Sequence, residues 1–206
     1  MGQMIMGPHQ GNPSAKTGAD PSDAYYAMIM VHGRGASAES ILQLSDEFKM
    51  PELHYVAPQA AGYSWYPYSF MAESQHNEPG LSSGLQAIDD LRISLNDSGI
   101  ADDHIFLLGF SQGACLALEY SARNARRYAG IFGLSGGLIG AEMNESLYEG
   151  HYAGTPVFLG CSDIDPHIPK ERVNETEQLL SAMGAEVSKM LYTNMGHLVN
   201  EHEISR

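Results

Sequence analysis

The sequence has few cysteines and few basic residues. Its two cysteines, Cys115 and Cys161, form no C-x-x-C pair, so we expect unpaired thiols in a reducing cytoplasm rather than a disulfide scaffold. Lys and Arg number 11 against 25 Asp and Glu, which gives a formal net charge of -14 over 206 residues. Because the chain is this acidic and lacks a basic run, we expect no nucleic-acid partner.

Long apolar segments are also lacking. The longest apolar run, residues 24–31, is too short to cross a bilayer. Residues 1–10 contain no basic segment followed by an apolar stretch, so we expect neither a membrane span nor a signal peptide, and a cytoplasmic location. The sequence has no H-E-x-x-H motif, no close Cys/His group and no P-loop. We therefore expect no metal and no other cofactor.

Short apolar runs alternate with helical patterns along the chain. Six runs are typical of buried strands, namely residues 26–31, 54–57, 105–109, 129–134, 156–159 and 187–192. Three segments have apolar residues at helical spacing, namely 37–48, 81–95 and 171–183. The alternation predicts an α/β fold, a mostly parallel central sheet with helices on both faces. We expect a single domain over residues 1–206, with an irregular arm at about 1–22 that could include one edge strand.

The pattern G-x-S-x-G occurs twice, around Ser111 and around Ser135. As a nucleophile motif it requires a strand that runs into a tight turn and then a helix. Ser111 follows an apolar run and precedes residues 112–120, which are rich in helix formers. Ser135 is followed by three glycines in five residues, a poor start for a helix. We therefore predict that Ser111 is the nucleophile and that Ser135 lies in a loop at the end of a strand.

A nucleophilic serine needs an imidazole to take its proton and a carboxylate to orient the imidazole. In an α/β-hydrolase the acid and then the histidine follow the serine along the chain, each beyond the end of a strand. The predicted strand at 156–159 leads to Asp163 and Asp165, and the last predicted strand leads to His197. We predict that His197 is the base. The spacing favours Asp165 as the acid but leaves Asp163 open.

Two backbone amides are expected to bind the oxyanion that forms during attack. One is the N–H of Gln112, at the start of the helix that follows the nucleophile. The other lies in the turn His32-Gly33-Arg34-Gly35 after an early strand, where the two glycines let the N–H of Arg34 approach a substrate oxygen.

The segment 59–70 is aromatic and too long for a plain connector. It either walls an acyl or aryl pocket at the carboxyl edge of the sheet or covers an apolar cluster, and we give the two interpretations equal weight. The candidate pocket residues are Trp65 and Tyr66 from this segment, together with Ser135.

As a set, these motifs resemble the small carboxylesterase, phospholipase and acyl-protein thioesterase family of α/β-hydrolases. The matching elements are, in chain order, His32-Gly33-Arg34-Gly35, Ala57-Pro58-Gln59, Trp65-Tyr66, Gly109-Phe110-Ser111-Gln112-Gly113-Ala114, Asp163-Ile164-Asp165-Pro166-His167-Ile168-Pro169 and Gly196-His197. The resemblance implies an α/β-hydrolase fold with a minimal lid or none. It also implies a triad of Ser111, Asp165 and His197, since the second Asp of D-x-D-P is the family's acid.

The resemblance further implies a serine hydrolase that cleaves short-chain carboxylic esters or thioesters through an acyl-enzyme. Its partner would be a small-molecule ester or thioester, and because family members are often dimers, a homodimer is a further expectation. One departure is Arg34, which stands where acyl-protein thioesterases usually carry an apolar residue. The alternative is a ligand-binding protein on the same scaffold whose catalysis has lapsed. A missing triad residue would indicate it, and the sequence retains all three.

Overall fold

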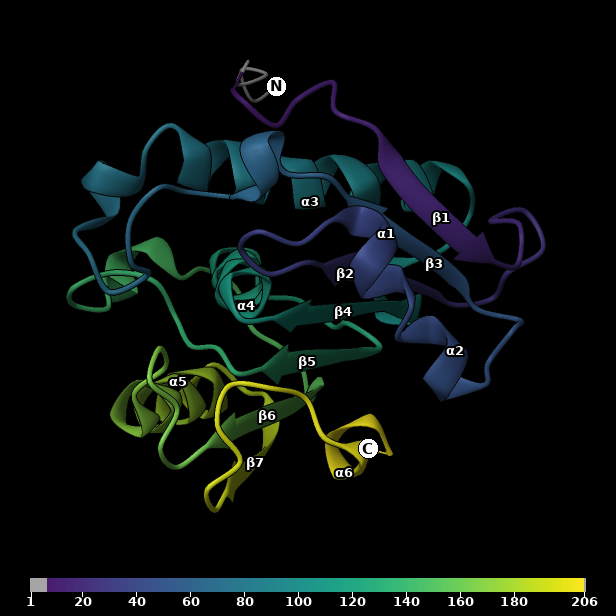
Figure 1. The fold of residues 1–206 in the computed structure, drawn as a ribbon. Helices are drawn as coiled ribbons and strands as arrows, with labels where there is room; N and C mark the ends of the chain where they lie inside the picture. Colours follow the sequence, from purple (N-terminus) through teal and green to yellow (C-terminus); the bar gives the residue numbers. More distant parts are fainter. Residues whose placement is uncertain (1–6, 206) are drawn as a thin grey trace.

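The computed structural model describes residues 7–205. At its centre is a seven-stranded sheet in the order β1-β3-β2-β4-β5-β6-β7, shown in Figure 1. Six strands run parallel, namely β2 (Ala27–Val31), β3 (His54–Pro58), β4 (Ile105–Phe110), β5 (Gly130–Leu134), β6 (Pro156–Ser162) and β7 (Glu186–Tyr192). These are the six predicted strands, with β6 three residues longer than the apolar run 156–159.

The seventh strand belongs to the amino-terminal arm. β1 (Ser14–Gly18) pairs antiparallel with β3 at one edge of the sheet. The arm predicted for about residues 1–22 therefore does contain an edge strand, and residues 1–6 lie outside the described part of the chain. Gly18 ends the strand with φ 80°, a conformation that glycine adopts without steric cost.

Helices cover both faces of the sheet (Figure 1). Three longer helices share one apolar core, namely α3 (Gly80–Asp97), α4 (Gln112–Arg123) and α5 (Lys170–Ala182). Three short helices lie on the other face, namely α1 (Ala38–Leu42), α2 (Ser45–Phe48) and α6 (Glu201–Ile204). Single 3-10 turns occur at Ala61–Tyr63, Ser74–Asn77, Asp102–His104 and Glu145–Leu147. None of the helices described between residues 7 and 205 is long and apolar enough to cross a membrane.

The strands are buried on both faces because their side chains alternate between the two cores. In β2, Ile29 and Val31 belong to the core under α3, α4 and α5, whereas Met28 and Met30 belong to the core under α1. This burial explains why the sequence of β2 is apolar at every position, without the alternation of a half-exposed strand.

One predicted helix is wrong in its extent. The segment 37–48 forms two short helices, because the backbone between them makes three-residue rather than four-residue hydrogen bonds. Leu44 donates its N–H to the carbonyl of Ile41 at 3.2 Å, and Glu47 donates to Leu44 at 3.1 Å. The apolar residues that suggested a single helix still pack against the core, which is why the spacing alone concealed the break.

The parallel strands bring the predicted site residues to one edge of the sheet. Arg34 follows β2, Ser111 follows β4, Asp165 follows β6 and His197 follows β7. Since the carboxyl ends of parallel strands meet at the same edge, residues far apart in the sequence become neighbours there.

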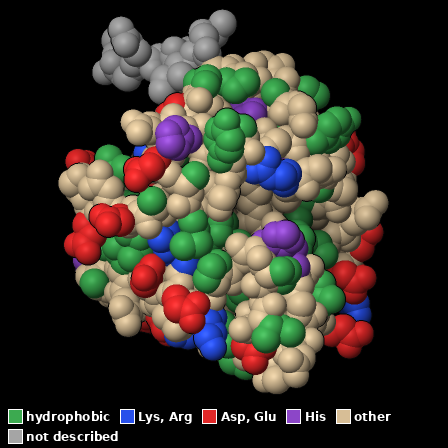
Figure 2. Space-filling model, turned by 60° about the vertical axis from the view of Figure 1, so that its left-hand side comes forward, with side chains coloured by type: hydrophobic (Ala, Val, Ile, Leu, Met, Phe, Trp, Pro, Cys, Tyr) green, Lys and Arg blue, Asp and Glu red, His purple; other side chains and the backbone are tan. Residues whose placement is uncertain are grey.

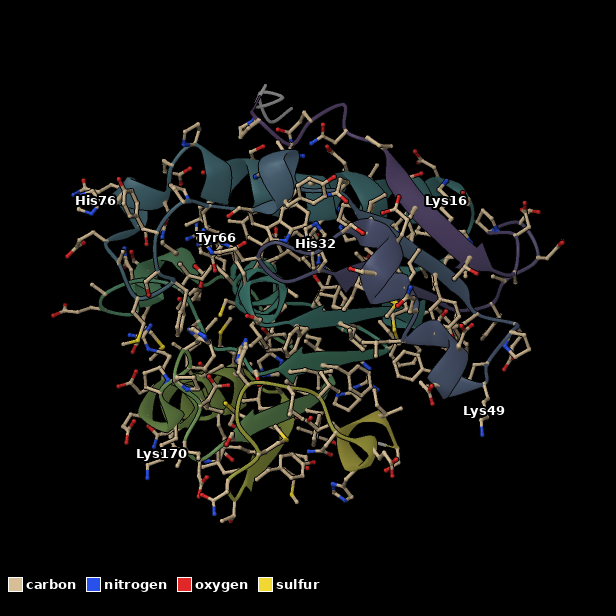
Figure 3. The ribbon with its side chains drawn as sticks, viewed as in Figure 1. Lys16, His32, Lys49, Tyr66, His76 and Lys170 are labelled. Carbon is tan, nitrogen blue, oxygen red and sulfur yellow. The ribbon has the colours of Figure 1, made fainter. Side chains whose placement is uncertain are left out.

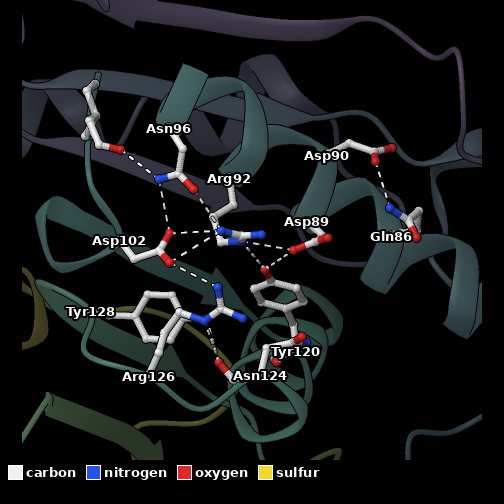
Figure 4. A network of polar contacts seen from close by, with 11 residues as sticks. Gln86, Asp89, Asp90, Arg92, Asn96, Asp102, Tyr120, Asn124, Arg126 and Tyr128 are labelled. Carbon is white, nitrogen blue, oxygen red and sulfur yellow. Dashed lines mark hydrogen bonds and ion pairs between the residues drawn. The ribbon is translucent and has the colours of Figure 1, made fainter. Parts of the chain in front are cut away.

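A polar network lies at the opposite, amino-terminal end of the strands (Figure 4). Arg92 of α3 donates to Asp89 at 2.9 Å and to Asp102 at 3.0 Å, and Arg126 also donates to Asp102 at 3.0 Å. The hydroxyl of Tyr120 in α4 donates to Asp89 at 2.7 Å. Burial raises the pKa of Asp102, but the hydrogen bonds from Arg126 and Arg92 outweigh burial and hold that pKa below its ordinary value. The network ties α3 and α4 to the turn before β4.

Asp102→Asn is expected to lower the free energy of unfolding by about 1–2 kcal/mol at neutral pH, because Arg126 loses its charged partner and Arg92 keeps only Asp89. The pKa of Asp102 is lower in the folded than in the unfolded chain, so the charged carboxylate stabilises the fold above the ordinary aspartate pKa of about 4. That contribution is lost as the pH falls below this value, and the variant should then approach wild type. Urea unfolding at neutral and acidic pH measures the difference.

Asp90→Asn is the matched control, because Asp90 lies on the same helix and contacts only Gln86 in the network of Figure 4. It should leave the unfolding free energy nearly unchanged. A pH-independent effect of Asp102→Asn, or equal effects of the two substitutions, would contradict the assigned role of the carboxylate.

Candidate active site

Ser111 occupies a strained turn between β4 and α4. Its φ of 56° and ψ of -121° lie in a region that residues with a Cβ atom rarely adopt. The Ser111 N–H donates to the carbonyl of Leu134 at 2.9 Å, which holds the turn against β5. A Cβ atom at Gly109 would overlap the carbonyl of Gly113, and one at Gly113 would overlap the carbonyl of Val31. The two glycines of the motif therefore allow α4 to begin directly above the strands.

The imidazole of His197 bridges Ser111 and Asp165. Nε2 lies 2.8 Å from Ser111 Oγ, and Nδ1 lies 2.7 Å from Asp165 Oδ2. The Asp165 side chain is 0% exposed, and its Oδ1 accepts the backbone N–H groups of His167 at 2.8 Å and Ile168 at 3.1 Å. Burial raises the pKa of Asp165, but the hydrogen bonds from His197 and the backbone outweigh burial and hold that pKa below its ordinary value.

A charged Asp165 determines which nitrogen of His197 carries the proton. A carboxylate only accepts hydrogen bonds, so Nδ1 must donate, and Nε2 is left to accept from the Ser111 hydroxyl. In this tautomer the imidazole is oriented to take the serine proton. Asp163 lies outside this arrangement, because its Oδ1 accepts the backbone N–H of Asn194 at 2.9 Å. Of the two candidate acids, only Asp165 contacts His197.

The backbone amides of Arg34 and Gln112 lie next to Ser111. Gln112 is the first residue of α4, and the Arg34 turn approaches so closely that a Cβ atom at Gly33 would lie 3.4 Å from Ser111 Cβ. Within residues 7–205, neither amide donates to a backbone carbonyl. Both N–H groups are therefore available to an oxygen atom held in front of Ser111.

The buried His32, for which the motifs predict no role, holds the Arg34 turn in place. Its Nε2 accepts the backbone N–H of Ala60 at 3.1 Å, and its Nδ1 donates to the carbonyl of Gly33 at 2.8 Å. Burial lowers the pKa of His32, which favours the neutral ring that this pair of bonds requires. The only signal in the sequence is its position directly before the glycine-rich turn.

His167 is a second residue that the motifs leave without a role. It follows β6 rather than the last strand, and its ring lies edge-on to His197, with the centroids 4.9 Å apart and the planes at 74°. The Phe110 ring lies 5.1 Å from the His197 ring, with the planes tilted by 34°. The two rings restrict how far the His197 imidazole can turn.

A groove of about 490 Å³ opens in front of Ser111 and His197. Residues 66–70 of the aromatic segment, together with Arg34 and Ile168, form much of its wall. Tyr66 lies inside the molecule, whereas His76 of the same connection points to solvent (Figure 3). Figure 2 shows a hollow between a Lys/Arg group and a His group, with Asp and Glu mainly around the outside of this face.

Two of the three candidate pocket residues lie outside the groove. Trp65 and Ser135 are 0% exposed, whereas Tyr66 lines the groove. Trp65 is part of the main core and donates its indole N–H to the carbonyl of His32 at 2.9 Å. Both interpretations of the aromatic segment therefore hold, since it walls the groove and also covers the core.

Ser135 has a positive φ of 52°, like Ser111, but no helix follows it. Its N–H donates to the carbonyl of Gly160 at 2.7 Å, and burial keeps its hydroxyl away from the groove. Of the two G-x-S-x-G serines, Ser111 is the one that contacts a histidine. Within residues 7–205, no three His, Cys, Asp or Glu side chains are grouped to hold a metal ion.

Comparison with known proteins places the chain in a family. Residues 13–206 match the model of the phospholipase/carboxylesterase family. The chain belongs to this family. The crystal structure of a phospholipase/carboxylesterase from Dyadobacter fermentans DSM 18053 is 40% identical, with a TM-score of 0.93, and the alignment covers 99% of this chain and 96% of that one. The predicted α/β-hydrolase fold and the family resemblance are thereby confirmed.

Curated relatives include proteins named acyl-protein thioesterase 1. The one from Gibberella zeae is 33% identical over 110 residues, which are 52% of this chain and 47% of the relative. The one from Debaryomyces hansenii is 25% identical over 215 residues, covering 94% of this chain and 93% of the relative. The match thus spans about half the length of the first relative and nearly all of the second.

Ser111→Gly is expected to be more stable than Ser111→Ala by about 1 kcal/mol, because glycine relieves a positive φ that costs residues with a Cβ about 1–3 kcal/mol. Both variants lose the hydroxyl, so the comparison isolates the backbone. Urea unfolding measures the difference.

Ser121, in the last turn of α4, provides the control pair. There the order should reverse, with Ser121→Gly less stable than Ser121→Ala by about 1 kcal/mol, the ordinary cost of glycine in a helix. If glycine is the less stable substitution at both positions, Ser111 is not strained.

Proposed function

We propose that this protein is a serine hydrolase that cleaves short-chain carboxylic esters or thioesters through an acyl-enzyme intermediate. The observation that carries the proposal is the hydrogen-bonded series from Ser111 Oγ through His197 to the buried carboxylate of Asp165. Membership in the phospholipase/carboxylesterase family and relatives named as thioesterases support the same chemistry.

In the first half of the reaction, His197 Nε2 takes the proton of Ser111 as Oγ forms a bond to the acyl carbon. The negative charge that develops on the carbonyl oxygen is held by the N–H groups of Arg34 and Gln112. Asp165 stabilises the resulting imidazolium and keeps its orientation. Collapse of the tetrahedral intermediate breaks the bond to the leaving alcohol or thiol, which receives the proton from His197.

In the second half, water replaces the leaving group. His197 takes a proton from the water as its oxygen attacks the acyl carbon, and the same two amides hold the second oxyanion. Release of the carboxylic acid returns the proton to Ser111. The groove of about 490 Å³, partly walled by residues 66–70, supports a small substrate with a short acyl chain.

The alternative of a lapsed hydrolase has no support in the site, because each of the three side chains contacts its neighbour in the series. We also propose a cytoplasmic location, which is supported by two cysteines that are buried and unpaired. The homodimer implied by the family resemblance stays a prediction.

Ser111→Ala is expected to lower kcat for p-nitrophenyl butyrate by at least about 10⁴-fold and to abolish labelling by a fluorophosphonate probe, because both need the nucleophilic hydroxyl. Ser135→Ala, at the second G-x-S-x-G, should keep both properties. Labelling that survives Ser111→Ala and disappears with Ser135→Ala would reverse the assignment.

Asp165→Asn is expected to lower kcat by about 10³–10⁴-fold with little change in the fold, because an amide that donates to Nδ1 imposes the wrong tautomer on His197. Asp163→Asn keeps an oxygen that can accept the Asn194 N–H, so its kcat should stay near that of wild type. Steady-state kinetics of the two variants distinguishes the two acids. A larger loss of kcat in Asp163→Asn than in Asp165→Asn would contradict the choice of Asp165.

A further inference from the structure

The guanidinium of Arg34 contacts one short segment of the groove wall through four hydrogen bonds. Its Nη1 donates to Ser64 Oγ and to the carbonyl of Pro67, both at 3.0 Å. Its Nη2 donates to the carbonyls of Tyr66 at 2.9 Å and Tyr68 at 2.8 Å. Four oxygens that lie within five consecutive residues thus converge on one side chain.

Unlike several other arginines in the fold, Arg34 has no carboxylate among these acceptors. Arg92, Arg123, Arg126 and Arg172 pair with carboxylates, whereas the ion pairs within residues 7–205 do not include Arg34. Its four acceptors are all neutral oxygens. A planar group with several N–H donors in a fixed fork can satisfy them together, whereas the ammonium of lysine is a compact point charge.

The side chain of Gln112 also holds this segment. Its Oε1 accepts the backbone N–H of Trp65 at 3.0 Å, and its Nε2 donates to the carbonyl of Tyr66 at 2.9 Å. Arg34 and Gln112 are the two residues proposed to bind the oxyanion through their backbone amides. Both therefore fix the groove wall with their side chains while presenting their amides to the substrate.

The backbone around Arg34 needs such support. It lies between Gly33 and Gly35, and Gly35 has a φ of 78°, so the turn has little stiffness of its own. The N–H of Gly35 donates to the carbonyl of Tyr63 at 2.7 Å, which ties the turn to the residue directly before the segment that Arg34 holds. An amide that is displaced from the oxyanion by about 1 Å can lower the rate by about 100-fold.

We propose that Arg34 is a positioning residue whose guanidinium clamps residues 64–68 to the Gly33–Gly35 turn, so that the groove wall and the Arg34 amide are held as one unit. The inference rests on the proposed hydrolase function for its kinetic consequence. Arg34 transfers no proton and its side chain acts through the backbone that it fixes.

The test combines substitution with chemical rescue. Arg34→Ala should lower kcat by about 10- to 100-fold while changing KM less, because the displaced amide matters most when the oxyanion forms. Added guanidinium ion, far below denaturing concentration, should restore kcat with saturation, because it fits the space between the four oxygens. Sodium chloride at the same ionic strength should not restore it, and Arg34→Lys should recover only part of the activity.

The control is Arg127→Ala. Arg127 is exposed, lies before the amino end of β5 and donates to the carbonyl of Ala153 at 3.2 Å. This variant should keep the kcat of wild type and should show no response to guanidinium. Circular dichroism of both variants checks that the fold is retained.

Hydrogen exchange provides a readout that does not require catalysis. In Arg34→Ala, the amides of Gly35, Trp65 and Tyr68, which are hydrogen-bonded in the structure, should exchange faster than in wild type. Guanidinium should slow them again.

The outcomes separate the two proposals. If wild type hydrolyses no ester or thioester but the exchange of these amides responds as expected, the clamp stands and the hydrolase function fails. If wild type is active and Arg34→Ala keeps its kcat, changes only KM, or folds but is not rescued by guanidinium, the clamp is overturned.

Discussion

The site depends on how closely the first turn of α4 approaches β2 and β4. Gly109 and Gly113 leave no room for a Cβ atom, so the helix begins directly at the strand ends. This approach forces Ser111 into a positive φ and places the Gln112 amide beside its hydroxyl. The strain is sustained because α4 is buried from Gln112 to Ala122, and relaxing the turn would expose that apolar surface.

The side chains that line the groove differ in charge from the chain as a whole. The net charge is -14, yet the groove lining contains Arg34, His167 and His197 and no Asp or Glu. The carboxylate of Asp165, which His197 contacts, is shielded from solvent. Because no carboxylate lines the groove, a negative charge in front of Ser111 would meet hydrogen-bond donors rather than repulsion.

Local patterns predict the strands and the serine turn well. Buried parallel strands are continuously apolar, and the Ser111 turn requires glycine at positions 109 and 113 of the motif itself. They do not show which side chains the fold buries, or which distant backbone groups those side chains bond. Trp65 looks like a pocket residue, but its indole N–H is taken by His32, a partner more than 30 residues away, inside the core. The roles of His32 and Arg34 depend on backbone groups of residues 60–68, which no motif specifies. Burial of Ser135 likewise follows from the packed sheet and helices around it.

The Asp102 network and the Ser111 turn lie at opposite ends of β4, a strand of six residues or roughly 20 Å. At one end ion pairs join the helices, and at the other Ser111 is held in a strained turn. A substitution near Asp102 can therefore change thermal tolerance without altering the groove, and a change among the exposed residues 67–69 can alter the groove wall without loosening the helices. Directed evolution of this protein could adapt stability and selectivity at separate positions, with few trade-offs between them.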